Sequence, residues 1–226
     1  MASKTLRLHH ELLLLALHDQ KGTLAFGRMV EYGIGGAIFT ELLLEERLRL
    51  VERTGWRSGQ LVEVADAAPT GDPAMDAALT RLAPKRRASP ASTVTRIGGI
   101  RGLRNLVATD LAQRGVLQES KREVLALFQR RVYPTLDPQP ERALVARIRK
   151  TLEGTADPDA RTAALVGLAD ATDSLSAIYS WNERRKLRRR IKAVREADVG
   201  SKAAREAIQT VIAAMAAGVV VATAAG

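Results

Sequence analysis

Apolar side chains recur at helical spacing along most of the chain, which predicts a mainly helical fold. Residues 9–18 form the clearest run, and residues 12–15 are apolar all round, as is typical of a helix enclosed on several sides. Further helices are expected over residues 23–32, 37–46, 74–82, 100–114, 141–154, 157–175 and 182–196. The uncharged residues 208–226 are rich in Ala and Gly, which favours a buried terminal helix over a membrane span.

Alternating patterns interrupt the helices and predict short strands. The segments RLRLVE and QLVEV flank a turn, so residues 47–64 are expected to form a β-hairpin. Apolar residues 116–117 and 124–128 flank the polar turn QESKRE and predict a second hairpin that projects apolar side chains. The Pro-, Ser- and Arg-containing residues 83–95 between them predict a mobile basic linker.

These patterns together predict one mainly α domain over residues 1–226. We expect its helices to bury one core and to be accompanied by one or two short β-hairpins. At 46% apolar residues the chain is long enough to bury such a core, and only 4% are aromatic, so Leu, Val, Ile and Ala must build it.

Charge points to an anionic partner. The formal net charge is +10, which suits a phospholipid surface or nucleic acid. Arg outnumbers Lys and Ala is abundant, which indicates GC-rich, bacterial coding. No signal peptide is expected, because His9, His10 and Glu11 lead straight into the first apolar run, and this favours a cytoplasmic protein.

Candidate chemistry is scarce. The chain has no cysteine, hence no disulfide, thiolate nucleophile or cysteine-based zinc site. His9, His10 and His18 lack a matching carboxylate cluster in the sequence, so we expect them to be structural. No phosphate-loop or Gly-x-Ser-x-Gly motif is present. We therefore expect that the protein is not an enzyme and that it has no catalytic residue, no cofactor and no metal site.

The basic residues concentrate in one window without acidic residues. Residues 77–109 contain seven cations and no carboxylate. Arg101 and Arg104 lie three apart near the start of the helix predicted from Ile100, where unpaired backbone N–H groups favour an anion. Guanidinium groups grip phosphate oxygens through paired donors, so the two arginines form a candidate phosphate site.

Four segments in the same order resemble the Golgi phosphoprotein 3 family: LRLHHELLLLALHDQKG, GIGGAIFTELLLEERLRL, DAAPTGD with MDAAL, and IRGLRNLVATDLAQRGVL. The resemblance covers nearly the whole chain and implies a peripheral membrane protein. It also implies a single helical domain with an inner helical core, surrounding amphipathic helices and a projecting hydrophobic hairpin. Eukaryotic members bind phosphatidylinositol 4-phosphate in a shallow basic pocket and act as adaptors for the tails of glycosyltransferases.

The resemblance also implies site residues. The family pocket uses a tryptophan, at the position of Phe26, and two arginines that match Arg101 and Arg104. Gly35 stands where the family has a further arginine, and Arg28 is our candidate to replace it. One lost charge-assisted contact contributes about 1.5–3 kcal/mol, so without that replacement affinity is expected to fall about tenfold or more.

The family hairpin corresponds to about residues 115–133. Arg130 and Arg131 at its exit predict a hairpin that stays at the membrane surface. Its expected membrane-contacting residues are Val124, Leu125, Leu127 and Phe128. The implied partners are an anionic phospholipid surface, tails of membrane proteins and a second copy of the chain through the hairpin.

Nucleic-acid binding is the alternative hypothesis. Short helices followed by a hairpin over residues 25–64 resemble a winged helix, and the basic residues 182–195 would follow phosphates. The sequence shows neither a base-reading helix nor aromatic stacking platforms, so we favour the membrane.

Overall fold

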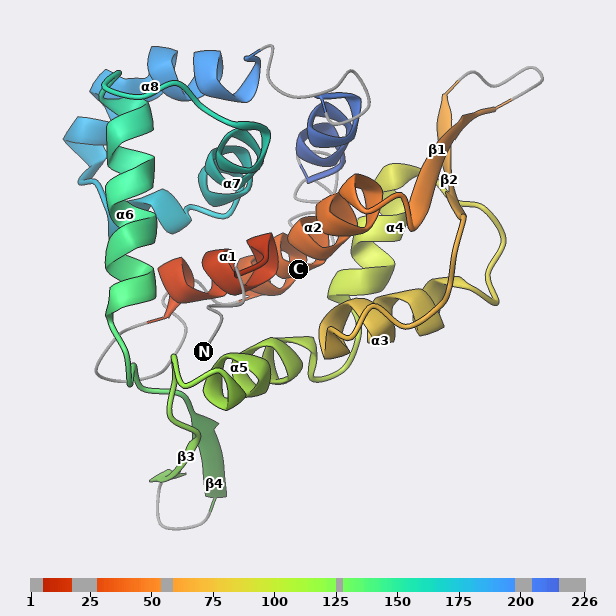
Figure 1. The fold of residues 1–226 in the computed structure, drawn as a ribbon, viewed down its shortest axis with the longest axis horizontal. Coiled ribbons are helices and arrows are strands. Elements are labelled where there is room, and N and C mark those ends of the chain that lie inside the picture. Colours follow the sequence, from red (N-terminus) through yellow and green to blue (C-terminus); the bar gives the residue numbers. More distant parts are fainter. Residues whose placement is uncertain (1–5, 18–27, 54–58, 125–127, 198–204, 216–226) are drawn as a thin grey trace.

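The computed structural model describes residues 6–17, 28–53, 59–124, 128–197 and 205–215. It is mainly helical with two short two-stranded antiparallel sheets, which confirms the expected fold class (Figure 1). The elements are α1 (Leu8–Ala16), α2 (Arg28–Leu44), β1 (Leu48–Glu52), β2 (Gln60–Val64), α3 (Pro73–Leu82), α4 (Pro90–Gly98), α5 (Leu103–Gln113), β3 (Ser120–Val124), β4 (Phe128–Val132), α6 (Gln139–Leu152), α7 (Ala160–Ala171), the 3₁₀ helix η1 (Ser174–Ala177) and α8 (Trp181–Arg195).

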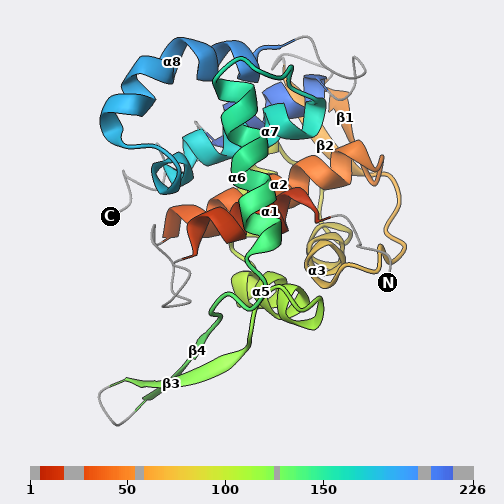
Figure 2. The same cartoon turned by 60° about the vertical axis from the view of Figure 1, so that its left-hand side comes forward.

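Helix α1 lies at the centre of the core. Every one of its residues is buried, as its all-round apolar sequence predicts. It contacts α2, α5, α6, α7 and η1, which surround it in Figures 1 and 2. The amphipathic helices α6 and α8 lie outside it, and α8 buries Ile191 and Val194 while its remaining face carries the basic residues.

A buried ion pair fixes the start of α1 to α2 and α7. Glu41 of α2 accepts the backbone N–H of Leu8 at 2.6 Å. Both oxygens of the same carboxylate accept from the Arg161 guanidinium, at 2.8 and 3.1 Å. A buried carboxylate is tolerated only when paired in this way, so the contact specifies how α1 enters the core.

Helix α2 is continuous, so the predicted division into two short helices at Gly33–Gly35 is wrong. Its glycines instead allow neighbouring elements to approach closely. A Cβ at Gly35 would lie 2.7 Å from the backbone nitrogen of Gly98 in α4, and one at Gly36 would lie 3.0 Å from Leu168 Cδ2 in α7. A glycine run in a helix therefore marks crossing points here rather than a break.

Helix α4 lies inside the predicted mobile linker, so that prediction is also wrong. Ser89 caps α4 with its side chain, and Pro90 occupies the first helical position, where its missing N–H costs nothing. Just before the cap, the N–H of Val62 in β2 donates to the carbonyl of Ala88 at 2.8 Å. The connection is thus held against the first sheet.

The hairpin of β1 and β2 confirms the prediction for residues 47–64. The second hairpin also forms, but residues 118–123 are not its turn, because residues 120–124 form β3 and pair with β4. β3 and β4 project away from the body of the protein (Figure 2). A strand pair that projects from the body needs no apolar alternation along its length, which is why the pattern misplaced the turn.

The C-terminal prediction is supported as far as the structure describes it. Residues 205–215 are helical, and Ile208, Val211 and Met215 are buried. Residues 216–226 lie outside the described residues. Among the described helices, none combines the length and the hydropathy that crossing a membrane requires.

Candidate functional site

The carboxylate-free window runs over the end of α3, the whole of α4 and the first half of α5. Arg104 lies in the first turn of α5, but Arg101 lies in the turn before the helix. The prediction of a helix from Ile100 is wrong because Gly102 is left-handed, with φ of 78°, and α5 begins only after it. Arg101 is consequently exposed, and Arg104 is half-buried.

Arg101 and Arg104 remain available for an anion. Within the described part of the chain neither makes an ion pair, and the polar side-chain contact of Arg104 is with Asn105 Oδ1 at 3.4 Å. By contrast, Arg114 at the C-terminal end of α5 is held by Asp110, whose Oδ2 lies 2.6 Å from Arg114 Nε. No side chain caps the start of α5, so its first N–H groups add the positive end of the helix dipole beside the two arginines.

The other residues implied by the resemblance are placed differently. Phe26 lies outside the described residues, and Arg28 begins α2 while its side chain is not described. Position 35 has no room for the family arginine. Its Cβ would meet the nitrogen, and at 2.9 Å the Cα, of Gly98. The backbone of α4 fills the space that such a side chain would need.

The β3–β4 hairpin combines an apolar tip with a basic shaft. Val124 pairs with Phe128 at the outer end of the strands, and Leu125 and Leu127, between the strands in the sequence, lie outside the described residues. Beyond the Glu123–Gln129 position, two successive register positions pair cations with cations: Arg122 with Arg130 and Lys121 with Arg131. Like charges directly opposite each other in a sheet destabilise it, so this shaft favours an anionic surface around it.

The base of the hairpin is fixed to the end of α5. The N–H groups of Leu136 and Asp137 donate to the carbonyl of Val116 at 2.9 and 3.1 Å. Tyr133 is buried, and its hydroxyl lies 3.3 Å from Thr109 Oγ1 in α5. The hairpin and the Arg101–Arg104 pair are therefore carried by opposite ends of one helix, α5.

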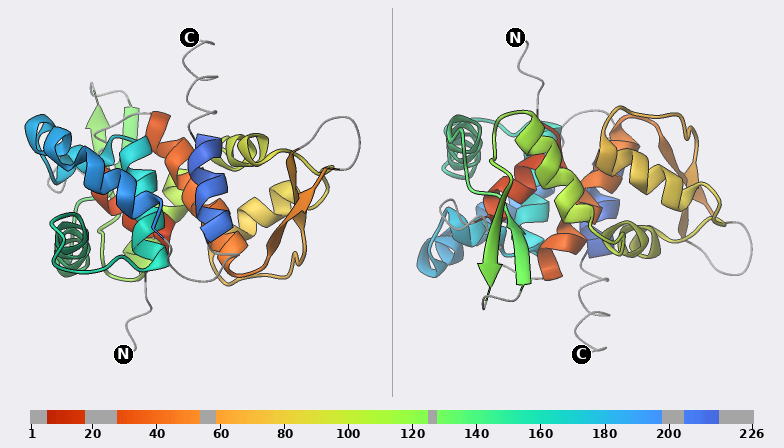
Figure 3. Two further views of the ribbon diagram at one scale, coloured as in Figure 1. Left: turned by 90° about the horizontal axis from the view of Figure 1, so that it is seen from above. Right: turned by 90° about the horizontal axis from the view of Figure 1, so that it is seen from below.

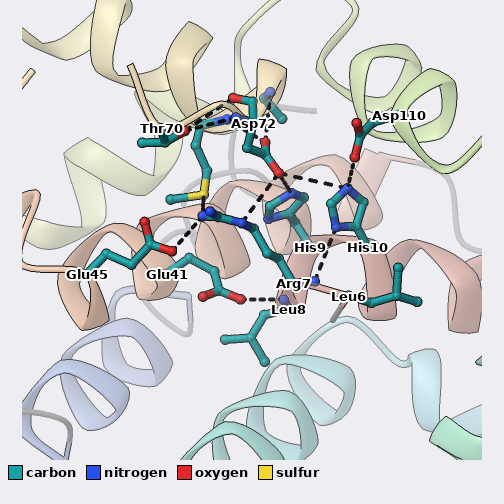
Figure 4. Close-up of polar contacts among 12 residues, drawn as sticks. Leu6, Arg7, Leu8, His9, His10, Glu41, Glu45, Thr70, Asp72 and Asp110 are labelled. Carbon is teal, nitrogen blue, oxygen red and sulfur yellow. Dashed lines mark hydrogen bonds and ion pairs between the residues drawn. The ribbon is translucent and has the colours of Figure 1, made fainter. Parts of the chain in front are cut away.

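A buried polar cluster joins α1 to α3 and α5 (Figure 4). Nε2 of His9 lies 3.0 Å from Asp72 Oδ2, and Nε2 of His10 lies 2.8 Å from Asp110 Oδ2. The other oxygen of Asp72 accepts the N–H groups of Ala74 and Met75 at 3.0 Å, so this side chain also caps the start of α3. For His9 and His10 the expectation that no carboxylates accompany them is thus wrong, and His18 lies outside the described residues.

The cluster is better suited to hydrogen bonding than to a metal ion. His9, His10 and Asp72 converge closely enough to hold one. However, Nδ1 of His10 accepts the backbone N–H of Arg7 at 3.2 Å, so Nε2 carries the ring proton and has no lone pair to offer. The Arg7 guanidinium also lies 3.8 Å from Asp72 Oδ2, where it opposes a second cation. We assign the cluster a positioning role for α3 and α5.

Burial sets the protonation of this cluster. Burial, with the neighbouring His9, lowers the pKa of His10 from 6.5 to about 4 and outweighs the contact with Asp110. Burial alone would raise the pKa of Asp72, but the hydrogen bond and charge of His9 hold it well below its ordinary value. At neutral pH the cluster therefore contains a neutral His10 beside an ionised Asp72.

Stability is expected to fall as the pH drops from 6.5 to about 4. In this range the unfolded chain takes up a proton at His10 that the folded chain does not, so acid favours unfolding. The full effect is on the order of 3 kcal/mol. Urea unfolding of the wild type and of His10→Asn across this range measures it. The variant should show a flatter profile, and an unchanged slope would contradict the assignment.

The buried first helix and the projecting hairpin, with unpaired arginines at the other end of α5, define the class: a helical protein built around one central helix. A profile of the family Golgi phosphoprotein 3 (GPP34) matches residues 8–211, and the chain belongs to this family. It is similar to vacuolar protein sorting-associated protein 74 of Eremothecium gossypii, with 28% identity over 164 residues, covering 66% of this chain and 49% of that protein. The chain thus matches about half the length of this relative.

Proposed function

We propose that this protein is a non-catalytic, peripheral membrane protein of the cytoplasmic face that binds anionic phospholipid headgroups. The observation that carries the proposal is the β3–β4 hairpin, in which two cation–cation register positions lie two and three residues from the apolar Val124–Phe128 pair, beyond the Glu123–Gln129 position. Family membership supports the same role. An apolar tip with a cationic collar fits an interface where acyl chains give way to phosphates.

The spacing along the hairpin matches the depth of that interface. Each strand residue rises ~3.3 Å, so the Arg122–Arg130 position lies about 7 Å and the Lys121–Arg131 position about 10 Å beyond the Val124–Phe128 pair. Interfacial elements bury their apolar part about 5–10 Å deep. A tip at that depth brings both cationic positions to the level of the lipid phosphates.

Arg101 and Arg104 form the proposed headgroup site, of phosphoinositide type. Among the described residues no carboxylate pairs with either guanidinium group, and the uncapped start of α5 lies beside them. Position 35 adds no third cation to the site. We therefore expect the protein to distinguish anionic from neutral lipids more strongly than it distinguishes one phosphoinositide from another. Each basic residue near the surface contributes about 1 kcal/mol to the free energy of membrane binding, so the attachment is reversible.

Replacing both arginines, as Arg101→Ala/Arg104→Ala, is expected to weaken binding to anionic vesicles about thirtyfold, since two cations contribute about 2 kcal/mol. Co-sedimentation with vesicles containing phosphatidylinositol 4-phosphate measures this. The control is Arg188→Ala/Arg189→Ala, which removes two exposed cations from α8 and should change binding less than threefold. Equal weakening in the two double variants would remove the proposed site.

Two further parts of the proposal rest on the family resemblance: an adaptor role for the tails of membrane proteins, and self-association through the hairpin. The winged-helix alternative is not favoured, because the predicted short helices before the first hairpin are the single helix α2.

A further inference from the structure

We propose that a cleft between β2 and α4 binds a phosphate group, at a place separate from Arg101 and Arg104. The cleft has a volume of about 210 Å³. This inference goes beyond the proposed membrane role and does not depend on it. The residues that line the cleft and carry the argument are Glu63, Lys85, Arg86, Arg87, Thr93 and Arg96.

The cleft is held by backbone contacts on both sides. The carbonyl of Ala88 accepts the N–H of Val62, which pins the basic segment to β2. The N–H of Lys85 donates to the carbonyl of Leu82 at the end of α3, at 2.9 Å. Across the cleft, Arg96 Nη1 donates to the carbonyl of Arg86 at 3.4 Å. The cations are therefore presented by fixed backbone.

The charges in the cleft are unbalanced. Four cations face one carboxylate, and that carboxylate, Glu63, is already taken by Arg87 at 2.8 Å. Among the described residues, Lys85, Arg86 and Arg96 make no ion pair. The positive end of the α4 dipole begins at Ser89, next to the cleft. Excess positive charge in a concave site concentrates anions there.

The size of the cleft favours a single phosphate group on a small molecule. Two guanidinium groups and one ammonium group supply the forked and point donors that grip phosphate oxygens. β1 and β2 lie at the opposite end of the protein from the β3–β4 hairpin in both views of Figure 3. A ligand in the cleft is thus remote from the hairpin that is proposed to enter the membrane, which favours a soluble phosphate monoester over a lipid headgroup.

Titration calorimetry of the full chain with inorganic phosphate, in buffer free of other oxyanions, tests the proposal. Wild type should bind saturably, and Arg86→Ala/Arg96→Ala should weaken binding at least tenfold. Arg86→Ala alone, at an exposed position, should weaken it severalfold without affecting folding. The matched control is Arg81→Ala/Arg188→Ala, which removes two exposed cations outside the cleft and outside the Arg101–Arg104 site and should change binding less than twofold.

Absence of saturable binding by wild type, or equal weakening in the two double variants, would overturn the proposal. Vesicles containing phosphatidic acid, a lipid phosphate monoester, distinguish the source of the phosphate. If Arg86→Ala/Arg96→Ala loses phosphate but still binds these vesicles, the ligand is soluble, and if it loses both, the cleft holds a lipid headgroup. Hairpin variants, which act on vesicles but not on inorganic phosphate, separate failure of the membrane proposal from failure of this one.

Discussion

Gly35→Arg is expected to destabilise the protein by about 3 kcal/mol or more, although arginine is the residue implied by the family resemblance at this position. A Cβ there would lie 2.7 Å from Gly98 N and 3.0 Å from the carbonyl oxygen of Val94. Overpacking typically costs about 1–3 kcal/mol, and the upper end applies because both contacts are with backbone that cannot rotate away. Urea denaturation at neutral pH measures the change.

The control for this substitution is Ala193→Arg, which places the same side chain at an exposed position of α8. It should change the free energy of unfolding by about 0.5 kcal/mol or less. If Gly35→Arg kept wild-type stability and bound phosphoinositide vesicles more tightly, α4 would not occupy the space of the arginine, and the headgroup site would be of the family type.

Reversing the charge of the hairpin shaft, as Lys121→Glu/Arg131→Glu, is expected to weaken binding to anionic vesicles about a hundredfold or more. Each basic residue near the surface contributes about 1 kcal/mol, and reversal both removes the attraction and adds repulsion. Lys121 and Arg131 share one register position and are exposed, while Arg131 also lies 3.5 Å from Glu119. Co-sedimentation at two salt concentrations measures the affinity and its screening.

The matched control is Arg188→Glu/Arg189→Glu on α8, which changes the net charge equally at a different surface. Screening over about 10 Å limits its effect on the hairpin, so binding should stay within a few-fold of wild type. The neutral variant Lys121→Gln/Arg131→Gln avoids repulsion with Glu119 and should be intermediate. Equal losses from the shaft and from α8 would show that net charge, rather than the hairpin, drives binding.

Local signals in the sequence predicted much of the fold. The apolar run at residues 12–15 predicted a buried helix because no other environment accepts an all-round apolar surface. The expected helix over residues 74–82 matches α3, whose start is set by adjacent residues, the Asp72 cap and Pro73. Alternation predicted the first hairpin, whose Leu48 and Val62 are buried against the core.

Features that depend on distant contacts were beyond the sequence. The His9–Asp72 contact joins residues 63 positions apart, and nothing local distinguishes these histidines from structural ones. The glycines of α2 predict a break in the helix when only the local sequence is considered. Their small size is needed because α4 approaches closely at Gly98, and this contact is not visible in the sequence. The basic connection 83–95 was taken as a linker because its pairing with β2 is a tertiary contact.

Insertion of the hairpin turn into an anionic bilayer is the central claim, and site-specific fluorescence tests it most directly. Because the chain has no cysteine, Ala126→Cys in the turn and Ala193→Cys on α8 each accept a single environment-sensitive dye. With anionic vesicles the dye at position 126 should shift to the blue, the dye at position 193 should not, and neutral vesicles should shift neither. An unshifted dye at position 126 on vesicles that the protein binds would contradict the claim.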